Sequence, residues 1–244
     1  MHKKLTLGFD IKPQPDDVTC GPTCLQALYR YYNDAISLKQ VIREVKQLKK
    51  GGTLAVILGN HALQRGYKAY IYSYNLNVID PSWFEYPSAK IVEFLKEQME
   101  FKRKRRKLQF VSKAFIKFLE SGGEIRYNEL DENLIKSYLK RSIPILTGLS
   151  ATYLYGSQRE IPKYDIYDPI KGDPAGHFVV ISGYDEEKKV AYLADPLASN
   201  PMGEGSSYSV SFNRLINSIM LGIVTYDANI LIIEPGKKQK KKNA

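Results

Sequence analysis

The first half of the chain carries apolar residues at helical spacing, in segments separated by turn signals. The pattern predicts a helix that begins at Cys20. A second helix is expected to start after Ser37, because Ser37 and Gln40 have the spacing of a capping box. A third helix is predicted over residues 53–65, where Gly66 ends the apolar stripe.

The middle of the chain alternates between strand and helix patterns. Residues 67–74 alternate and are rich in aromatic side chains, which predicts a strand. A long segment of one or two helices follows over residues 88–120, and residues 124–127 have the pattern of a short strand. Asp131 is the expected cap of a further helix that ends near Arg141.

The last third of the chain changes to a strand pattern. The expected elements are strands over residues 143–149, 177–184, 190–194 and 230–233, with one short helix over residues 211–220. Because helices come first and strands later, the order predicts an α+β fold. We expect one domain over residues 1–235, with a helical part at about 14–141 and a sheet part at about 142–235. Residues 236–244 are expected to form a disordered basic tail.

Length and composition narrow the class of protein. The chain has 244 residues, of which 43% are hydrophobic, so it is long enough to bury a large core. It contains no run of about 18 apolar residues, and we expect neither a membrane-spanning helix nor a secretory signal. Its two cysteines, Cys20 and Cys24, are too few for a disulfide-stapled scaffold, which favours free thiols and a cytoplasmic location.

The net charge of +10 raises the question of an anionic partner. Residues 102–107 are six consecutive basic residues, and five more lysines stand in the tail at residues 237–242. Removing these eleven charges from +10 leaves −1, so the basicity lies in two local runs. Such runs are usually solvated faces or tails, and this interpretation is favoured. An acidic or anionic partner that binds Lys102–Lys107 and the C-terminal lysines is the second interpretation.

The strongest chemical signal is a cysteine at the start of the first helix. Helix N-termini present free N–H groups and a partial positive charge, and both favour a thiolate at this place. Gly21 removes bulk beside the sulfur, and Pro22 suits the first turn of a helix. Cys20 is therefore a candidate nucleophile. Cys24, one turn further on, is interpreted as a small buried hydrophobic residue.

Only one of the three histidines stands where a catalytic base is expected. His2 lies at the terminus, and His61 lies inside the third helix, where a packed or surface role is favoured. His177 begins an apolar strand after a long loop that contains Gly172 and Gly176. A catalytic base often lies where a strand meets a loop at the edge of the core, so His177 is the candidate base.

Asp195 is the candidate partner of His177. If the hairpin between the two strands is centred on Glu186, His177 faces Asp195 and Val179 faces Leu193. A shift of the hairpin centre by one residue leaves His177 and Asp195 diagonal to each other. A Cys-His nucleophile needs such a carboxylate to hold the tautomer and orientation of the imidazole.

Gln14 completes the candidate site. Its amide, six residues before Cys20, can form an oxyanion hole together with the Cys20 backbone N–H. A zinc site built from Cys20, Cys24, His177 and Asp195 is an alternative, but these residues lack the paired ligand spacing of zinc proteins. We therefore expect no metal and no cofactor.

At these residues the sequence resembles the papain-like cysteine peptidases, and more narrowly the family of bacteriocin-processing (double-glycine leader) peptidases. The stretches that carry the resemblance are residues 14–25, 176–185 and 192–196. A weaker match over residues 143–156 resembles stand-alone cytoplasmic members of this group. The resemblance implies a papain-like fold, in which N-terminal helices with the nucleophile at a helix N-terminus pack on a C-terminal antiparallel sheet that carries the histidine and the aspartate.

The resemblance also implies a role for each candidate residue. Cys20 would be the nucleophile and His177 the general base and acid, while Asp195 would orient the imidazole and Gln14 would stabilise the oxyanion. The leading hypothesis is a cysteine peptidase that cleaves a peptide or isopeptide bond of a peptide or protein substrate through an acyl-enzyme intermediate.

Other functions stay open at the level of sequence. A thiol-dependent acyl or peptidyl transferase uses the same triad. A module with vestigial catalytic residues that binds an anionic partner through its basic runs belongs to a different class. A third hypothesis combines the two, with Lys102–Lys107 docking an acidic substrate.

Overall fold

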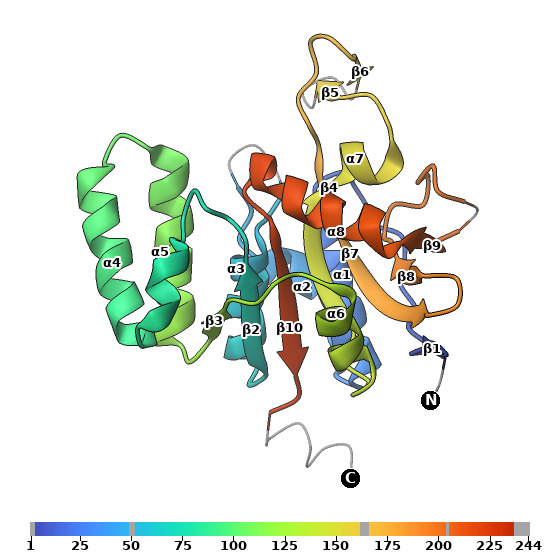
Figure 1. The fold of residues 1–244 in the computed structure, drawn as a ribbon, viewed down its shortest axis with the longest axis horizontal. Coiled ribbons are helices and arrows are strands. Elements are labelled where there is room, and N and C mark those ends of the chain that lie inside the picture. The colour runs from blue at the N-terminus through green and yellow to red at the C-terminus, as the bar shows by residue number, and fades with distance from the viewer. Residues whose placement is uncertain (1–2, 49–51, 162–165, 204, 237–244) are drawn as a thin grey trace.

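The computed structural model describes residues 3–48, 52–161, 166–203 and 205–236 of the chain. Its centre is one mixed sheet in the order β3-β2-β10-β4-β7-β8-β9, with β1 paired to β7 (Figure 1). The strands of this sheet are β1 Lys4–Thr6, β2 Lys68–Ser73, β3 Glu124–Arg126, β4 Ile145–Ser150, β7 Gly176–Asp185, β8 Val190–Ala194, β9 Ser207–Ser211 and β10 Asn229–Glu234. A separate small sheet joins β5 Glu160–Ile161 to β6 Ile166–Tyr167.

Helices cover both faces of the main sheet, so the α+β class predicted from the sequence is confirmed (Figure 1). One buried cluster joins the first face to α1 Cys20–Tyr31, α2 Leu38–Glu44, α3 Ala55–Gln64, α4 Ser88–Phe101 and α5 Arg106–Glu120. A second cluster joins the other face to α6 Glu132–Leu139, α7 Ala151–Tyr155 and α8 Phe212–Leu221. Two short 3-10 helices are η1 Pro81–Glu85 and η2 Gly222–Thr225.

The central strands are mostly apolar because both of their faces are buried. In β7, Val180 belongs to the cluster with α1–α5, whereas Val179 and Ile181 belong to the cluster with α6–α8. In β10, Leu231 belongs to the cluster with α1–α5, and Ile230 belongs to the cluster with α6–α8. The alternation follows from the pleat, which directs successive side chains to opposite faces.

The expected division into a helical part and a sheet part at residues 141 and 142 does not hold in space. β2 and β3 come from the helical part, yet they belong to the main sheet. β2 pairs antiparallel with β10 and parallel with β3, so the sheet is mixed. β10 lies between β4 and β2 because a strand buried on both faces needs hydrogen-bond partners for its backbone on both edges. The predicted tail, from residue 237 onward, lies outside the described residues.

Several local predictions agree with the structure. Ser37 caps α2 by accepting from the Gln40 backbone N–H at 3.2 Å, and Asp131 caps α6 by accepting from the Leu134 backbone N–H at 2.7 Å. The long helical segment over residues 88–120 is a hairpin of two helices, α4 and α5, and the basic run occupies the turn between them (Figure 1). Within the described ranges, no helix has the length and apolar character needed to cross a membrane.

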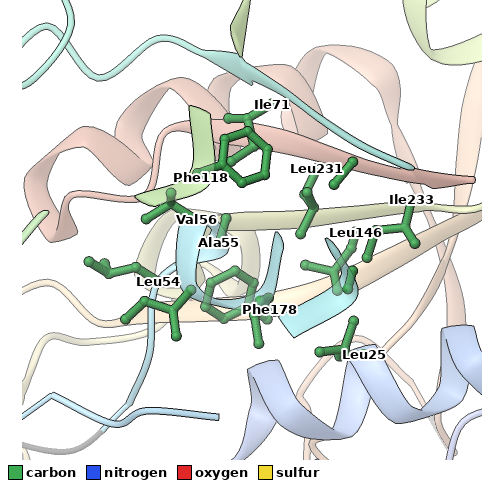
Figure 2. Close-up of a cluster of buried hydrophobic side chains, with 14 of the residues drawn as sticks. Leu25, Leu54, Ala55, Val56, Ile71, Phe118, Leu146, Phe178, Leu231 and Ile233 are labelled. Carbon is green, nitrogen blue, oxygen red and sulfur yellow. The ribbon is translucent and has the colours of Figure 1, made fainter. Parts of the chain in front are cut away.

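Phe178 joins the start of β7 to α1 and α3 through the core (Figure 2). Its side chain lies in a cluster that includes Leu25 and Leu54. A Cβ atom at Gly21 would lie 3.2 Å from the Phe178 ring and 2.6 Å from the Thr53 Cγ2 atom. The lack of a side chain at Gly21 therefore allows the first turn of α1 to approach the first residues of β7.

Candidate active site

Cys20 is the first residue of α1 and lies at the positive end of the helix. Thr19, at the N-cap, makes no side-chain capping hydrogen bond, and the first turn contains no acidic residue. The terminal N–H groups and the helix dipole are therefore not neutralised by a carboxylate of the helix itself. The Thr23 hydroxyl donates to the Thr19 carbonyl at 2.8 Å and ties this turn together. Cys20 is buried, with 8% of its surface exposed.

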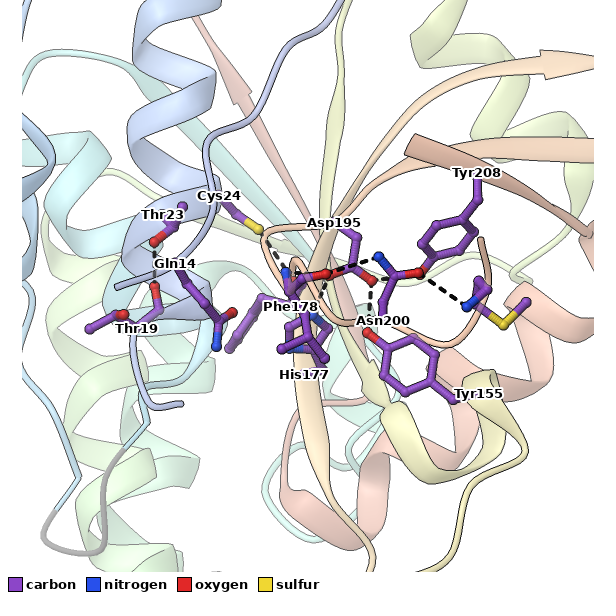
Figure 3. A network of polar contacts seen from close by, with 12 residues as sticks. Gln14, Thr19, Thr23, Cys24, Tyr155, His177, Phe178, Asp195, Asn200 and Tyr208 are labelled. Carbon is purple, nitrogen blue, oxygen red and sulfur yellow. Dashed lines mark hydrogen bonds and ion pairs between the residues drawn. The ribbon is translucent and has the colours of Figure 1, made fainter. Parts of the chain in front are cut away.

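His177 is the second residue of β7 and bonds one member of the candidate triad, Asp195, directly. Its Nε2 atom lies 2.7 Å from Asp195 Oδ1 (Figure 3). The Cys20 thiol lies near enough to the same imidazole to raise its pKa. Burial by itself would lower the pKa of His177, but the hydrogen bonds and charges of Asp195 and Cys20 raise this pKa to about 10. The ion pair with Asp195 therefore favours the protonated form of the imidazole.

Asp195 is fully buried and accepts four hydrogen bonds (Figure 3). Oδ1 accepts from His177 and, at 2.9 Å, from the Leu197 backbone N–H. Oδ2 accepts from the hydroxyls of Tyr155 at 2.7 Å and Tyr208 at 2.6 Å. Burial would raise the pKa of this carboxyl, but its hydrogen bonds, that from His177 foremost, hold the pKa below the ordinary value. The carboxylate stays ionised, and its orientation is set at both oxygens.

The hairpin that brings His177 and Asp195 together has a different register from the predicted one. Leu193 faces Ile181, whereas the prediction paired Leu193 with Val179. A β-bulge next to Ile181 changes the pairing along the hairpin. Continuing the register of the Ile181–Leu193 pair leaves Asp195 diagonal to His177. The prediction of direct opposition is therefore wrong, and the side chains bridge a diagonal offset.

Gln14 lies in the loop before α1 and lines a pocket of about 100 Å³ together with His177 and Tyr155. Figure 3 shows its side chain extended toward His177. The Gln14 backbone N–H donates to the Pro196 carbonyl at 2.8 Å, which ties this loop to the segment after β8. Its Nε2 atom donates to the Asp16 carbonyl at 2.9 Å, and this bond uses one of the two amide hydrogens. Oε1 is buried and has no hydrogen-bond partner among the described residues.

The other cysteine and the second histidine are held in structural contacts. Cys24 is fully buried, its thiol donates to the Phe178 carbonyl at 3.3 Å, and burial raises its pKa well above the ordinary value. His61 lies between the Tyr29 hydroxyl at 2.7 Å and the Glu44 carboxylate at 3.0 Å, and burial lowers its pKa. The part of the chain that the structure describes contains no group of three or more His, Cys, Asp and Glu residues arranged to hold a metal ion. His2 lies outside that part.

The sequence does not reveal the two tyrosines that bond Asp195. Tyr155 lies in α7, within residues 143–156. The weaker family resemblance over these residues implies no role for it. Tyr208 lies in β9, whose Ser-Tyr-Ser-Val-Ser alternation is short and mostly polar, so the pattern does not predict a strand there. The chain has 18 tyrosines, and the residue type by itself therefore marks no site.

Comparison with protein families gives a match over the C-terminal part of the chain. Residues 125–217 match the model of the Peptidase_C39 like family. The matched segment includes His177 and Asp195 but neither Cys20 nor Gln14. A comparison with curated proteins gives no match.

Solved structures align with most of the chain. A crystal structure described as a C39-like peptidase from Bacillus anthracis aligns with a TM-score of 0.50 at 12% identity, over 96% of this chain and 99% of that chain. A double glycine motif protease from an AMS/PCAT transporter, in complex with the leader peptide, aligns with a TM-score of 0.45 at 15% identity, over 94% of each chain. Xylellain, a cysteine protease from Xylella fastidiosa, aligns with a TM-score of 0.44 at 15% identity, over 96% of this chain and 87% of that chain.

These comparisons confirm the resemblance that the motifs indicate. The alignment with the Bacillus anthracis structure shows that the chain shares the α+β fold of that structure. The family model independently matches the segment that carries His177 and Asp195. Together, the shared fold and the family match over residues 125–217 agree with the resemblance to C39-like peptidases.

Proposed function

We propose that the chain is a cysteine peptidase that cleaves a peptide or isopeptide bond with a triad of Cys20, His177 and Asp195. The observation that carries the proposal is that the His177 imidazole bonds the Asp195 carboxylate and lies near enough to the Cys20 thiol for that thiol to raise its pKa. Because Nε2 of His177 bonds Asp195, Nδ1 is the ring nitrogen left to serve Cys20. This is the arrangement of nucleophile, base and orienting carboxylate that covalent acyl transfer needs.

In the proposed reaction, the Cys20 sulfur attacks the carbonyl carbon of the scissile bond. The His177 imidazolium then donates its proton to the leaving amine as the C–N bond breaks, and the acyl group stays on the sulfur as a thioester. In the second half, His177 takes a proton from water while the water oxygen attacks the thioester. The C–S bond breaks, the acid product leaves, and His177 again carries the proton. Asp195 stays ionised and holds the ring throughout.

The start of α1 supplies the proposed oxyanion hole. The backbone N–H groups at the first residues of a helix have no intrahelical acceptor, so the Cys20 N–H is available to the oxyanion. The second amide hydrogen of Gln14, which the Asp16 contact leaves unused, is the other proposed donor. Both donors are fixed relative to the sulfur, because the Gln14 loop is tied to Pro196.

Cleavage of a degenerate peptide library, with products identified by mass spectrometry, tests the proposal. We expect the wild type to cleave the library and Cys20→Ala to lose all detectable turnover. Cys24→Ser is the matched control, because its hydroxyl can still donate to the Phe178 carbonyl that Cys24 contacts. Full turnover by Cys20→Ala would overturn the assignment of the nucleophile. Adding amines to the same assay distinguishes hydrolysis from acyl or peptidyl transfer, because an amine that resolves the thioester leaves a coupled product.

An anionic partner at the basic run is a second proposal. It is supported by the exposed cations in the turn between α4 and α5, whereas the C-terminal lysines lie outside the described residues. If the triad were vestigial, the chain would bind a polyanion in a salt-dependent way, and Cys20 would react with iodoacetamide no faster than an ordinary thiol. Rapid alkylation at about pH 6 that is lost in His177→Ala would support the enzyme instead.

The proposed partner of the active site is a peptide or protein substrate.

Both cysteines are free thiols, although Cys20 and Cys24 are only one helical turn apart. Free thiols persist in reducing compartments, and we therefore propose the cytoplasm as the location.

A further inference from the structure

The turn between α4 and α5 is a cationic surface without counterions of its own. Arg103, Lys104, Arg105 and Arg106 are all exposed, and none of them has an ion-pair partner in the described part of the chain. We refer to these four residues as the basic turn. The helix hairpin that carries the basic turn stands at one edge of the fold, and its buried face belongs to the core shared with α1–α3 (Figure 1). Four neighbouring like charges create a strong local potential that attracts anions.

Lys107, the next residue, connects the basic turn to the candidate active site. Its Nζ atom lies 4.2 Å from the centroid of the Tyr226 ring and donates to the Thr225 carbonyl at 3.4 Å. The Thr225 side chain packs against Gly176, where a Cβ atom would lie only 2.8 Å from Thr225 Oγ1. Gly176 directly precedes His177 in β7. The basic turn is therefore joined to the rim of the active site by a short series of direct contacts.

The pocket beside His177 has the opposite charge character. Two carboxylates, Asp17 and Glu160, line it together with the His177 imidazole, and no lysine or arginine is among its described lining residues. An acidic side chain of a substrate is disfavoured in this pocket and attracted toward the basic turn. A chain bound across the site therefore meets a negative region at the pocket and a positive region at the basic turn.

We propose that the basic turn is an exosite that binds an acidic segment of the substrate, on one side of the scissile bond only. The inference rests on the proposed peptidase function and adds a substrate class to it. Since exposed ion pairs are individually weak, several of them together supply an effect of about tenfold on kcat/KM. The effect depends on ionic strength, because all four cations are exposed to solvent.

Three degenerate peptide libraries test this proposal. One carries a run of Asp and Glu on the N-terminal side of the randomised region, one carries the same run on the C-terminal side, and one carries Asn and Gln at both places. The measured quantity is the ratio of kcat/KM for each acidic library to that of the neutral library. The ratio is measured for the wild type and for a basic-turn variant. This variant carries the substitutions Arg103→Gln, Lys104→Gln, Arg105→Gln and Arg106→Gln.

A charge-matched control separates the exosite from net charge. The control variant carries Gln at four exposed basic residues elsewhere on the surface: Lys39, Arg43, Lys117 and Lys188. We expect one of the two acidic libraries to show a ratio of about ten in the wild type and in the control variant. The ratio is expected to fall to about one in the basic-turn variant and at high salt.

The outcomes distinguish the exosite from the peptidase itself. Equal ratios in the wild type and the basic-turn variant would overturn the exosite and leave the peptidase intact. If the wild type cleaves no library, the peptidase proposal fails, and the exosite is then tested by binding alone. In that case, fluorescence anisotropy with a labelled Asp-Glu peptide and the Cys20→Ala protein reports the exosite. If the Cys20→Ala protein binds this peptide equally well with and without the basic-turn substitutions, the exosite proposal is overturned.

Discussion

Tyr155 and Tyr208 donate hydrogen bonds to the same oxygen of Asp195, at 2.7 and 2.6 Å. One tyrosine comes from α7 and the other from β9, so two separate elements converge on Oδ2. The other oxygen, Oδ1, bonds His177. The phenols therefore anchor the carboxylate from one side while it orients the imidazole from the other.

Removing both phenol hydroxyls is expected to weaken the site through Asp195. In the double variant Tyr155→Phe and Tyr208→Phe, the carboxylate loses two donors, so its pKa rises and the acidic limb of kcat/KM moves to higher pH. Each change is also expected to lower the free energy of unfolding by about 1.5–3 kcal/mol, the range for hydrogen bonds to charged groups. The pH profile and urea unfolding are the measurements.

The control for this pair is Tyr153→Phe, which changes an exposed tyrosine of the same helix, α7. It should leave the acidic limb where it is. An unshifted acidic limb in the double variant would show that the two tyrosines only pack beside the site.

Gln14→Ala is expected to lower kcat by roughly 100-fold to 1000-fold, the range for the loss of one oxyanion donor, with a much smaller effect on KM. The backbone contact of Gln14 with Pro196 remains in the variant, so the loop keeps its position. Gln158→Ala is the matched control, since Gln158 lines the same pocket. Steady-state kinetics on a cleaved peptide provide the measurement. Similar kcat values for the two variants would remove Gln14 from the oxyanion hole.

Stability is expected to depend on pH through Asp227. This buried carboxylate accepts from the Ala55 backbone N–H at 3.0 Å and from Asn229 Nδ2 at 2.9 Å, and burial raises its pKa to about 7. The folded state therefore binds the proton more tightly than the unfolded state, whose pKa is about 3.9. The contribution of Asp227 to the free energy of unfolding therefore falls as pH rises from about 4 to about 7. Above pH 7 this contribution stays low.

Asp227→Asn tests this dependence, because it keeps an oxygen acceptor and removes the ionisation. Relative to the wild type, the variant should gain stability as pH rises from about 4 to about 7 and keep that gain above pH 7, on the order of 1.4 kcal/mol for each pKa unit of difference. Urea unfolding at several pH values measures it. Parallel curves for the two proteins would contradict the raised pKa.

Gly21→Ala is expected to disturb the approach of α1 to β7. The new Cβ would lie 2.6 Å from Thr53 Cγ2 and 3.2 Å from the Phe178 ring, so neighbouring atoms must move. Overpacking of this kind costs about 1–3 kcal/mol, and the displacement of Cys20 relative to His177 should lower kcat as well. Gly203→Ala is the control, because a Cβ there meets nothing within 4 Å. Equal stability and activity of the two variants would show that the packing at Gly21 is loose.

The local sequence determined which elements carry the nucleophile and the base. Cys20 begins α1 and His177 lies near the start of β7, as predicted, because helix and strand signals depend on neighbouring residues. Asp195 follows His177 in the same hairpin, so the short connection between β7 and β8 brings the two close in any plausible register. The α+β class also followed from the order of these local patterns.

Only the tertiary structure decided the register of that hairpin, the mixed sheet and the two tyrosines on Asp195. The bulge beside Ile181 lies where β1, far away in the sequence, pairs with β7. The Leu7 backbone N–H, just after β1, donates to the Ser182 carbonyl at 2.9 Å. Tyr155 and Tyr208 reach one oxygen because α7 and β9 pack around β7 and β8. A sequence pattern specifies which face of an element is buried, but it does not specify which distant element covers that face.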